Sequence, residues 1–366
     1  MPPLSVLIKP ASSACNLRCQ YCFYADEAAL RAVGNRGVMT PAVLRRLLER
    51  VFAEADGPVS LLFQGGEPLI AGLPFFEEAV ALAQQLNARR LPVSYALQTN
   101  GTLLNDDWAA FFARHRFLVG VSLDGTKELH DLVRPGAQGG GTHKQVLAGI
   151  AALRRHGVEF NILTVVTGRL ARSAQKVYNF YSKEGFCYQQ YIPCLDPLAG
   201  PRGREPYSLT PAAYGRFLKD LFDCWYRDVC RGVFVSERWF DNLIGLLQGR
   251  PPENCAQCGQ CTVQLVVEAD GSVYPCDFYA LDEYRLGSVE DSTLAQLRAC
   301  EAAQAFLAPA RTRDAACEAC QWLPLCRGGC RRDRDSGGQL GRSYFCESYQ
   351  AFFPYALPRL LELARR

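Results

Sequence analysis

Short apolar runs alternate with amphipathic stretches along the first half of the chain. The predicted strands lie at 5–9, 59–63, 93–97, 117–121, 158–166 and 187–192, and predicted helices at 74–86, 106–115, 144–156 and 173–184 follow a first helix that begins at Thr40-Pro41. Threonine can cap a helix, and proline suits its first position. Six strand–helix units in series predict an α/β fold whose parallel strands form a barrel or a partial barrel through right-handed crossovers.

Polar motifs follow three of these predicted strands directly. They read Gln64-Gly65-Gly66-Glu67-Pro68, Gln98-Thr99-Asn100-Gly101 and Ser122-Leu123-Asp124-Gly125. Reactive residues of parallel barrels gather at the carboxyl ends of the strands, so these motifs are expected to meet at one site. A glycine pair by itself is more often a turn, but at such a site it lets the backbone approach a ligand closely.

The second half of the chain has a different pattern. We divide the chain into a partial barrel at 1–196, a mainly helical bridge at 197–254, a small cysteine-rich domain at 255–346 and a C-terminal helix at 347–366. Within the bridge, Cys224 and Cys230 are predicted to be core residues. In the cysteine-rich domain, Asp270-Gly271 between apolar runs predicts a hairpin over 264–274.

Composition narrows the function classes. The net charge of +3 comes without a basic stripe interleaved with aromatic residues, so we expect no nucleic-acid partner. The start of the chain lacks a secretory layout and no apolar run is long enough to cross a bilayer, so we expect a cytoplasmic protein without a membrane partner. Seventeen cysteines in such a protein favour metal binding over disulfides, and only four histidines disfavour a histidine-rich site.

The first cysteine group is Cys15-x3-Cys19-x2-Cys22. A four-iron cube bound by cysteines needs four ligands, so three thiols would leave one iron open for a reactive ligand. The alternative is half of a zinc site, because zinc knuckles use similar spacings.

The second cysteine group begins at Cys255 and continues through Cys258, Cys261 and Cys276. It then reads Cys317-x2-Cys320-x5-Cys326-x3-Cys330, followed by Cys346. Spacing alone leaves two interpretations open, closed iron–sulfur clusters and structural zinc.

The two groups together resemble a known family. The first is similar to the signature of radical S-adenosylmethionine (radical SAM) enzymes, and the second resembles their SPASM extension. This resemblance implies S-adenosylmethionine and three 4Fe–4S clusters, one that binds S-adenosylmethionine and two auxiliary. The implied ligands are Cys15, Cys19 and Cys22 for the first cluster, Cys255, Cys261, Cys276 and Cys330 for one auxiliary cluster, and Cys317, Cys320, Cys326 and Cys346 for the other. Cys258 leaves the register of the first auxiliary ligands open.

Longer motifs, including the run from Leu7 to Cys19 and Tyr274-Pro275-Cys276-Asp277-Phe278-Tyr279, resemble the anaerobic sulfatase-maturating enzymes. The resemblance implies oxidation of a cysteine or serine in a sulfatase polypeptide to Cα-formylglycine. The 5′-deoxyadenosyl radical would remove a Cβ hydrogen, Asp277 would take the proton, and an auxiliary cluster would accept the electron. The implied partners are an unfolded or nascent sulfatase with a Cys/Ser-x-Pro-x-Arg motif and an electron donor such as flavodoxin or ferredoxin.

The same resemblance assigns further site residues. It implies S-adenosylmethionine contacts for Tyr21, Gly65, Gly66, Glu67, Ser122, Arg134 and Leu195, and substrate contacts for Tyr24, Gln98, Thr99 and Asn100. Simpler interpretations stand beside the roles of four residues. Arg134 could be a solvated surface charge, Gln98 and Asn100 could cap turns, and Asp277 could be a solvated acid or an acid that only supports a cluster ligand.

Two other functions remain open on the sequence. One is another peptide-modifying SPASM enzyme, such as a thioether-forming maturase, for which we expect a leader-recognition domain that the short stretch before Cys15 does not accommodate. The other is a non-catalytic iron–sulfur or zinc protein, which would need neither an open three-cysteine site nor polar motifs at strand ends.

Overall fold

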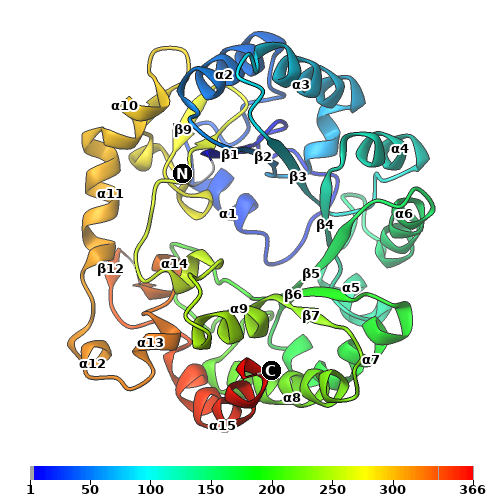
Figure 1. Ribbon diagram of the computed structural model, residues 1–366, viewed down its shortest axis with the longest axis vertical. Coiled ribbons are helices and arrows are strands. Elements are labelled where there is room, and N and C mark those ends of the chain that lie inside the picture. The colour runs from blue at the N-terminus through cyan, green and yellow to red at the C-terminus, as the bar shows by residue number, and fades with distance from the viewer. Residues whose placement is uncertain (1–3, 337, 366) are drawn as a thin grey trace.

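A computed structural model describes residues 4–336 and 338–365 of the chain. Within these residues the strands form one sheet of ten and one of two (Figure 1). The centre of the large sheet consists of six consecutive parallel strands: β1 (Leu4–Ile8), β2 (Val59–Phe63), β3 (Val93–Thr99), β4 (Leu118–Ser122), β5 (Phe160–Val166) and β6 (Tyr188–Pro193). This arrangement confirms the six predicted strands and the parallel α/β fold.

Helices cover the outer face of these strands (Figure 1). They are α2 (Pro41–Glu54), α3 (Leu73–Leu86), α4 (Asp106–His115), α6 (His143–Arg155) and α7 (Ala174–Glu184), and all five were predicted. Thr40 caps α2 as expected, because its hydroxyl accepts a hydrogen bond from the Val43 amide. Two helices were not predicted, α1 (Phe23–Leu30) and α5 (Lys127–Val133). They have eight and seven residues, about two turns each, which is too short to show a helical period.

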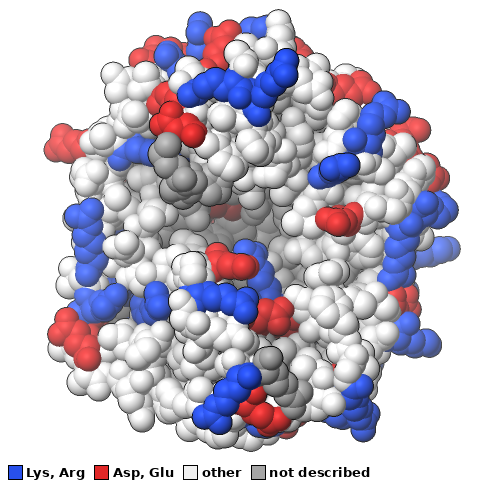
Figure 2. All heavy atoms as spheres, in the orientation of Figure 1, with Lys and Arg blue, Asp and Glu red and all other residues white. Residues whose placement is uncertain are grey.

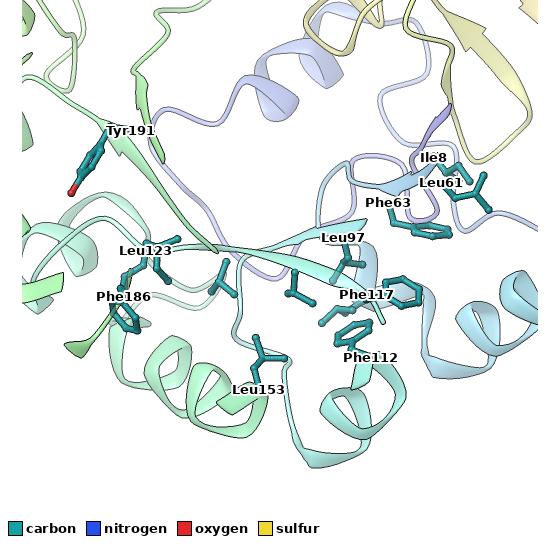
Figure 3. Close-up of a cluster of buried hydrophobic side chains, with 14 of the residues drawn as sticks. Ile8, Leu61, Phe63, Leu97, Phe112, Phe117, Leu123, Leu153, Phe186 and Tyr191 are labelled. Carbon is teal, nitrogen blue, oxygen red and sulfur yellow. The ribbon is translucent and has the colours of Figure 1, made fainter. Parts of the chain in front are cut away.

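The barrel core lies between the sheet and these helices. Figure 3 shows Phe63 and Leu97 from the strands lying near Phe112 of α4 and Phe117 beside it. These four side chains are at most 2% exposed. Burial of one such side chain contributes about 1.5–3 kcal/mol to stability, so a core of this extent holds the strand ends in fixed positions.

The bridge contains α8 (Pro211–Cys230), β7 (Ser236–Glu237) and α9 (Arg238–Leu247). The strand β7 was not predicted, and it extends the sheet beyond β6. Cys224 is buried in α8, whereas Cys230 is exposed at its end, so the prediction of a core position was wrong for Cys230. The C-terminal helix α15 (Cys346–Ala364) lies against α8, where Ser348 donates a hydrogen bond to the Pro211 carbonyl.

The cysteine-rich part has short elements: β8 (Val266–Val267), β9 (Ser272–Tyr274), β10 (Gly287–Ser288), α10 (Leu294–Ala299), α11 (Glu301–Arg311), α12 (Ala315–Glu318), α13 (Leu323–Cys326), α14 (Arg331–Arg334), β11 (Asp335–Ser336) and β12 (Gln339–Leu340). Short 3₁₀ turns lie at Pro68–Ala71, Leu170–Ser173, Cys255–Gln257, Asp277–Tyr279 and Asp282–Tyr284. β8 and β9 form the predicted hairpin.

One pairing was not expected. β8 also runs parallel to β1, with Leu7 opposite Val266 and Ile8 opposite Val267, so one sheet continues from the barrel into the cysteine-rich part. Figure 1 shows this contact where the blue first strand lies beside the yellow hairpin. In the part of the chain that the structure describes, no helix combines the length and the apolar character needed to span a bilayer.

Candidate active site

A cavity of about 210 Å³ lies at the carboxyl ends of the parallel strands. The face in Figure 2 is hollowed near its centre. The cavity lining includes Cys15, Cys19, Tyr21, Cys22, Tyr24, Gly65, Gly66, Gln98, Thr99, Asn100, Ser122, Arg134, Leu195 and Asp277. The structure therefore brings the first cysteine group together with almost all of the site residues expected from the sequence.

The three cysteines of the first group lie on the loop between β1 and α1. The Leu17 amide points at the Cys15 sulfur at 3.4 Å, and the Asn100 side-chain amide lies 3.7 Å from the same atom. Burial raises the pKa of the Cys19 thiol to about 11. Binding of a metal group here therefore requires the thiols to lose their protons, with donors such as these two amides compensating the sulfur charge.

The glycine pair after β2 packs directly on this cysteine loop. The Gly66 amide donates to the Ser12 carbonyl at 2.9 Å. A Cβ on Gly66 would lie 2.2 Å from the Ala14 carbonyl oxygen, and Gly65 has a φ of +127°. Only glycine can adopt the φ found at Gly65 and fit the space found at Gly66. The pair therefore sets the distance between the end of β2 and the cysteines.

Glu67 is placed differently from the other expected cofactor contacts. It is fully buried, and within the described part of the chain it is absent from the cavity lining. Its carboxylate accepts hydrogen bonds from the Thr99 hydroxyl at 2.8 Å, the Asn100 amide at 2.7 Å and the Leu69 amide at 3.1 Å. Burial raises its pKa to about 7. The carboxylate thus joins the ends of β2 and β3, whereas the two glycines beside it line the cavity.

A buried polar network holds Arg134 at the cavity wall. Its guanidinium donates to the Tyr21 hydroxyl at 2.7 Å, and that hydroxyl donates to Asp124. Arg134 is only 6% exposed, which rules out the interpretation as a solvated surface charge. Sequence reasoning did not single out Asp124 as a site residue, although its place directly after β4 was a usable signal.

Asp277 lies at the edge of the cavity, directly after Cys276. Its Oδ2 accepts hydrogen bonds from the Tyr24 hydroxyl at 2.6 Å and the Gln64 side-chain amide at 3.1 Å. Among the described residues its buried Oδ1 has no hydrogen-bond partner. Burial raises the pKa of Asp277, while Lys9 lowers it. The interpretation as a solvated acid is therefore wrong, and Gln64 joins the site from the strand-end motif in which the sequence already placed it.

Of the two residues predicted to cap a turn at the end of β3, Asn100 does so, whereas Gln98 lies within the strand and does not. Asn100 stabilises its own turn, because its Oδ1 accepts from the Thr102 amide at 2.9 Å, while its amide group reaches Asn16 at 2.8 Å. Gln98 donates to the Ser122 hydroxyl at 3.1 Å. Both residues also line the cavity, so for Asn100 turn capping and a contact to a bound molecule are compatible.

A second cavity of about 260 Å³ adjoins the first. It is lined by Cys255, Cys261, Cys276, Cys326 and Cys330, and it shares Ile192, Pro193, Leu195 and Phe278 with the first cavity. Burial raises the pKa of Cys330, and Cys255 and Cys261 raise it further because they lie close by. Within the described residues, Cys258 is exposed and does not line this cavity.

The remaining cysteines gather around α12, α13 and the start of α15. Burial raises the pKa of Cys326 to about 11, and neighbouring Cys346, Cys317 and Cys320 raise it further. Over the described ranges, no three His, Cys, Asp or Glu side chains converge on a position for a single metal ion.

Fold and cysteine groups together define the class of protein, an enzyme of the radical SAM superfamily with an added iron–sulfur domain. Residues 10–180 match the family described as the Radical SAM superfamily, and residues 255–321 match SPASM, an iron–sulfur cluster-binding domain.

Comparison with whole proteins narrows the class. The chain is 46% identical to the cysteine-type anaerobic sulfatase-maturating enzyme of Clostridium perfringens, over all of this chain and 99% of that enzyme. It is 32% identical to the serine-type enzyme of Bacteroides thetaiotaomicron, over 97% of this chain and 90% of that enzyme. A solved structure of native anSMEcpe with bound AdoMet and Kp18Cys peptide superposes with a TM-score of 0.95, at 46% identity over 100% of this chain and 99% of that one. The chain belongs to the anaerobic sulfatase-maturating enzymes.

Proposed function

We propose that this enzyme oxidises a cysteine of a sulfatase polypeptide to Cα-formylglycine. One observation carries the proposal: the cavity that holds the open three-cysteine loop also holds the buried Tyr24–Asp277 pair, beside the second cavity and its cysteines. A site for making a radical, a base and an electron-accepting site thus adjoin one another. Cysteine is preferred as the target because the cysteine-type relatives are 44–46% identical and the serine-type relatives 32–33%.

The residues present fit the proposed cofactors. Cys15, Cys19 and Cys22 would hold a 4Fe–4S cluster, and Gly65, Gly66 and the guanidinium of Arg134 line the space for S-adenosylmethionine. Tyr21, Ser122 and Leu195 line it too, whereas Glu67 supports it from behind. When bound, the cluster and S-adenosylmethionine would together supply the 5′-deoxyadenosyl radical that removes the Cβ hydrogen atom.

We assign two auxiliary clusters to the second cysteine group, three clusters in all. Cys255, Cys261, Cys276 and Cys330 would hold the first auxiliary cluster, and Cys317, Cys320, Cys326 and Cys346 the second. The exposed Cys258 is left out of both sets. Cys326 also lines the second cavity, which supports the proposal that the two auxiliary sites are neighbours.

The proton chemistry falls to Asp277. Its unpartnered Oδ1 can take the proton from the sulfur of the target cysteine, while Tyr24 and Gln64 hold its Oδ2 in place. Loss of that proton allows the second electron to leave without creating a cation. The product of a cysteine is then a thioaldehyde, which water hydrolyses to the aldehyde with release of hydrogen sulfide. Gln98, Thr99 and Asn100 line the same cavity and are proposed to contact the peptide.

We also propose the partners of the enzyme and the limits of its domains. We propose a nascent or unfolded sulfatase with a Cys-x-Pro-x-Arg motif as the substrate, and a flavodoxin or ferredoxin as the electron donor. The proposed division is a barrel at 1–196, a bridge at 197–254, a SPASM domain at 255–346 and a C-terminal helix at 347–366. The pairing of β1 with β8 couples the first and third of these closely.

The deciding experiment uses two peptides that differ only in the target, Cys-x-Pro-x-Arg and Ser-x-Pro-x-Arg. Each is incubated anaerobically with reconstituted enzyme, S-adenosylmethionine and a reductant, and is then weighed by mass spectrometry. We expect an aldehyde on the cysteine peptide at a clearly higher rate. Formation of 5′-deoxyadenosine with both peptides intact would overturn the substrate, and a faster serine peptide would overturn the cysteine preference.

A further inference from the structure

Directly behind the Tyr24–Asp277 pair lie four buried charged residues with no assigned role. Lys9 follows β1, Glu268 follows β8, Glu27 lies in α1 and Arg31 lies at its end. Each of the four side chains is at most 3% exposed. We name these four residues the seam cluster, because they lie where the barrel meets the cysteine-rich part.

The β1–β8 pairing explains why this cluster exists. The parallel register sets Ile8 opposite Val267, and the Lys9 amide donates to the Val267 carbonyl at 2.8 Å. The next residues along the two strands, Lys9 and Glu268, therefore fall side by side. Their side chains form an ion pair at 2.9 Å, and Arg31 binds the same Glu268 oxygen at 2.6 Å.

Stability is a weak reason for such a cluster. Removing two charges from water costs several kcal/mol per ion, and apolar replacements of buried pairs are often neutral or stabilising. Among the described residues, the Glu27 Oε2 makes no hydrogen bond and has only long ion-pair contacts, 3.8 Å to Lys9 and 3.5 Å to Arg31. A positional role accounts better for the placement of these charges.

The Lys9 side chain contacts Tyr24 of the Tyr24–Asp277 pair. Its ammonium lies 4.8 Å from the centre of the Tyr24 ring, a distance at which a cation is attracted to an aromatic face. Its stem packs under the glycine turn, because a Cβ on Gly65 would lie 3.3 Å from the Lys9 Cβ. Tyr24 in turn donates the 2.6 Å hydrogen bond to Asp277.

We propose that Lys9 is a positioning residue for the reaction. Its ammonium, anchored by Glu268, fixes the Tyr24 ring, and the Tyr24 hydroxyl then holds the Asp277 carboxylate toward the substrate. The proposal rests on the proposed role of Asp277. It adds that the docking of the cysteine-rich part on the barrel, through Glu268, sets the geometry of the base.

The test is a double-mutant cycle between Lys9→Met and Tyr24→Phe. Methionine keeps the unbranched stem and removes only the cation. We expect Lys9→Met to lower kcat for aldehyde formation at least about tenfold, as misplaced catalytic groups do. In the Tyr24→Phe background, which lacks the hydroxyl, Lys9→Met should cause no further loss, because residues that act through one another are not additive.

Two further measurements separate positioning from folding. Affinity for an unreactive peptide with alanine at the target should stay within about twofold, since Lys9 does not line the cavity in the described structure. The matched control is Arg36→Met, which removes another ion pair across the same seam, to Asp270 at 2.6 Å, away from Tyr24. It should keep wild-type aldehyde formation.

The outcomes discriminate cleanly. An unchanged kcat for Lys9→Met, fully additive losses, or an equal loss in Arg36→Met would each overturn the positioning role. If Lys9→Met fails to retain iron, Glu268→Gln takes its place in the double-mutant cycle with Tyr24→Phe. This variant keeps the Lys9 cation and removes its anchor. Absence of aldehyde with the wild-type enzyme would instead count against the proposed function.

Discussion

The barrel and the segment 311–344 bury opposite kinds of residue. The barrel encloses aromatic and aliphatic side chains such as Phe63, Phe112 and Leu153. In the segment 311–344, of the residues described, Leu325 is the only buried hydrophobic side chain, while Arg331, Arg332, Asp333, Arg334 and Asp335 are all buried. A chain with so little apolar surface to bury needs another source of order, and the cysteines point to metal clusters as that source. We therefore expect the order of the segment 311–344 to depend on a metal centre bound by its cysteines, whereas the order of the barrel should not depend on its cysteine loop.

The largest expected effect concerns the open site on the barrel. Cys19→Ala should abolish cleavage of S-adenosylmethionine, because two thiols cannot hold the cluster, yet it should leave the barrel folded. Chromatography of 5′-deoxyadenosine, together with circular dichroism, measures both. Cys187→Ala, at an exposed position outside both cysteine groups, is the control and should be fully active. Residual 5′-deoxyadenosine from Cys19→Ala would refute this ligand assignment.

Removal of iron should loosen the segment 311–344 and leave the barrel unchanged. After anaerobic chelation, amides in 311–344 should exchange with solvent roughly a hundredfold faster or more, because that segment loses its ordering centre. Amides in β2 to β5 should keep their protection, since their core is apolar. Mass spectrometry of hydrogen exchange reports both regions in one experiment. Equal protection of 311–344 with and without iron would show that the segment is ordered by its buried charges alone.

Asp277→Asn tests chemistry at the boundary between the two regions. The amide keeps the shape of the side chain and cannot take a proton, so aldehyde formation should fall by about a hundredfold or more. Cleavage of S-adenosylmethionine should continue, because the three-cysteine loop is untouched. Parallel assays of 5′-deoxyadenosine and aldehyde measure how much aldehyde forms for each S-adenosylmethionine that is cleaved. An unchanged aldehyde yield would remove Asp277 from the role of base.

Leu153→Ala should weaken the barrel alone. Leu153 is fully buried beneath the sheet, and loss of such a side chain costs about 2–5 kcal/mol. Denaturant unfolding monitored by circular dichroism measures the change. The iron content of 311–344 and its exchange pattern should remain those of the wild type in native buffer. A simultaneous loss of cluster iron would mean that the two regions unfold together.

A further expected effect is a pH dependence of stability at the β7 end of the sheet. Glu237, in β7, is 2% exposed, and burial raises its pKa to about 8. The folded state thus holds this proton more tightly than the unfolded state does. Its contribution to stability is complete below the unfolded pKa near 4.5 and is lost as the pH rises through about 8. Glu237→Gln should flatten the pH profile of unfolding by up to about 1.4 kcal/mol per pH unit in that window. The exposed Glu301→Gln should leave the profile unchanged.

Local patterns made much of this structure predictable. Apolar runs of strand length and capped amphipathic helices identified the parallel sheet, and the cysteine spacings identified the class of site. The pairing of β8 with β1 was not predictable, because a two-residue strand has no period and its partner lies in a distant part of the sequence. For the same reason the sequence did not reveal Lys9 and Glu268 as neighbours, nor the burial of Glu67 behind the glycines.

That pairing has a consequence for the order in which the protein can be completed on the ribosome. Ile8 and Val267 are joined across about 260 residues. At the usual rate of about 5–20 residues per second, β8 emerges on the order of 13 to 50 s after β1. Until then the outer edge of β1 is an open strand, the kind of edge that pairs with foreign chains. When the protein is expressed at a high rate, unfinished chains that do not yet include β8 should therefore aggregate. A factor that covers β1 of the nascent chain should reduce this aggregation.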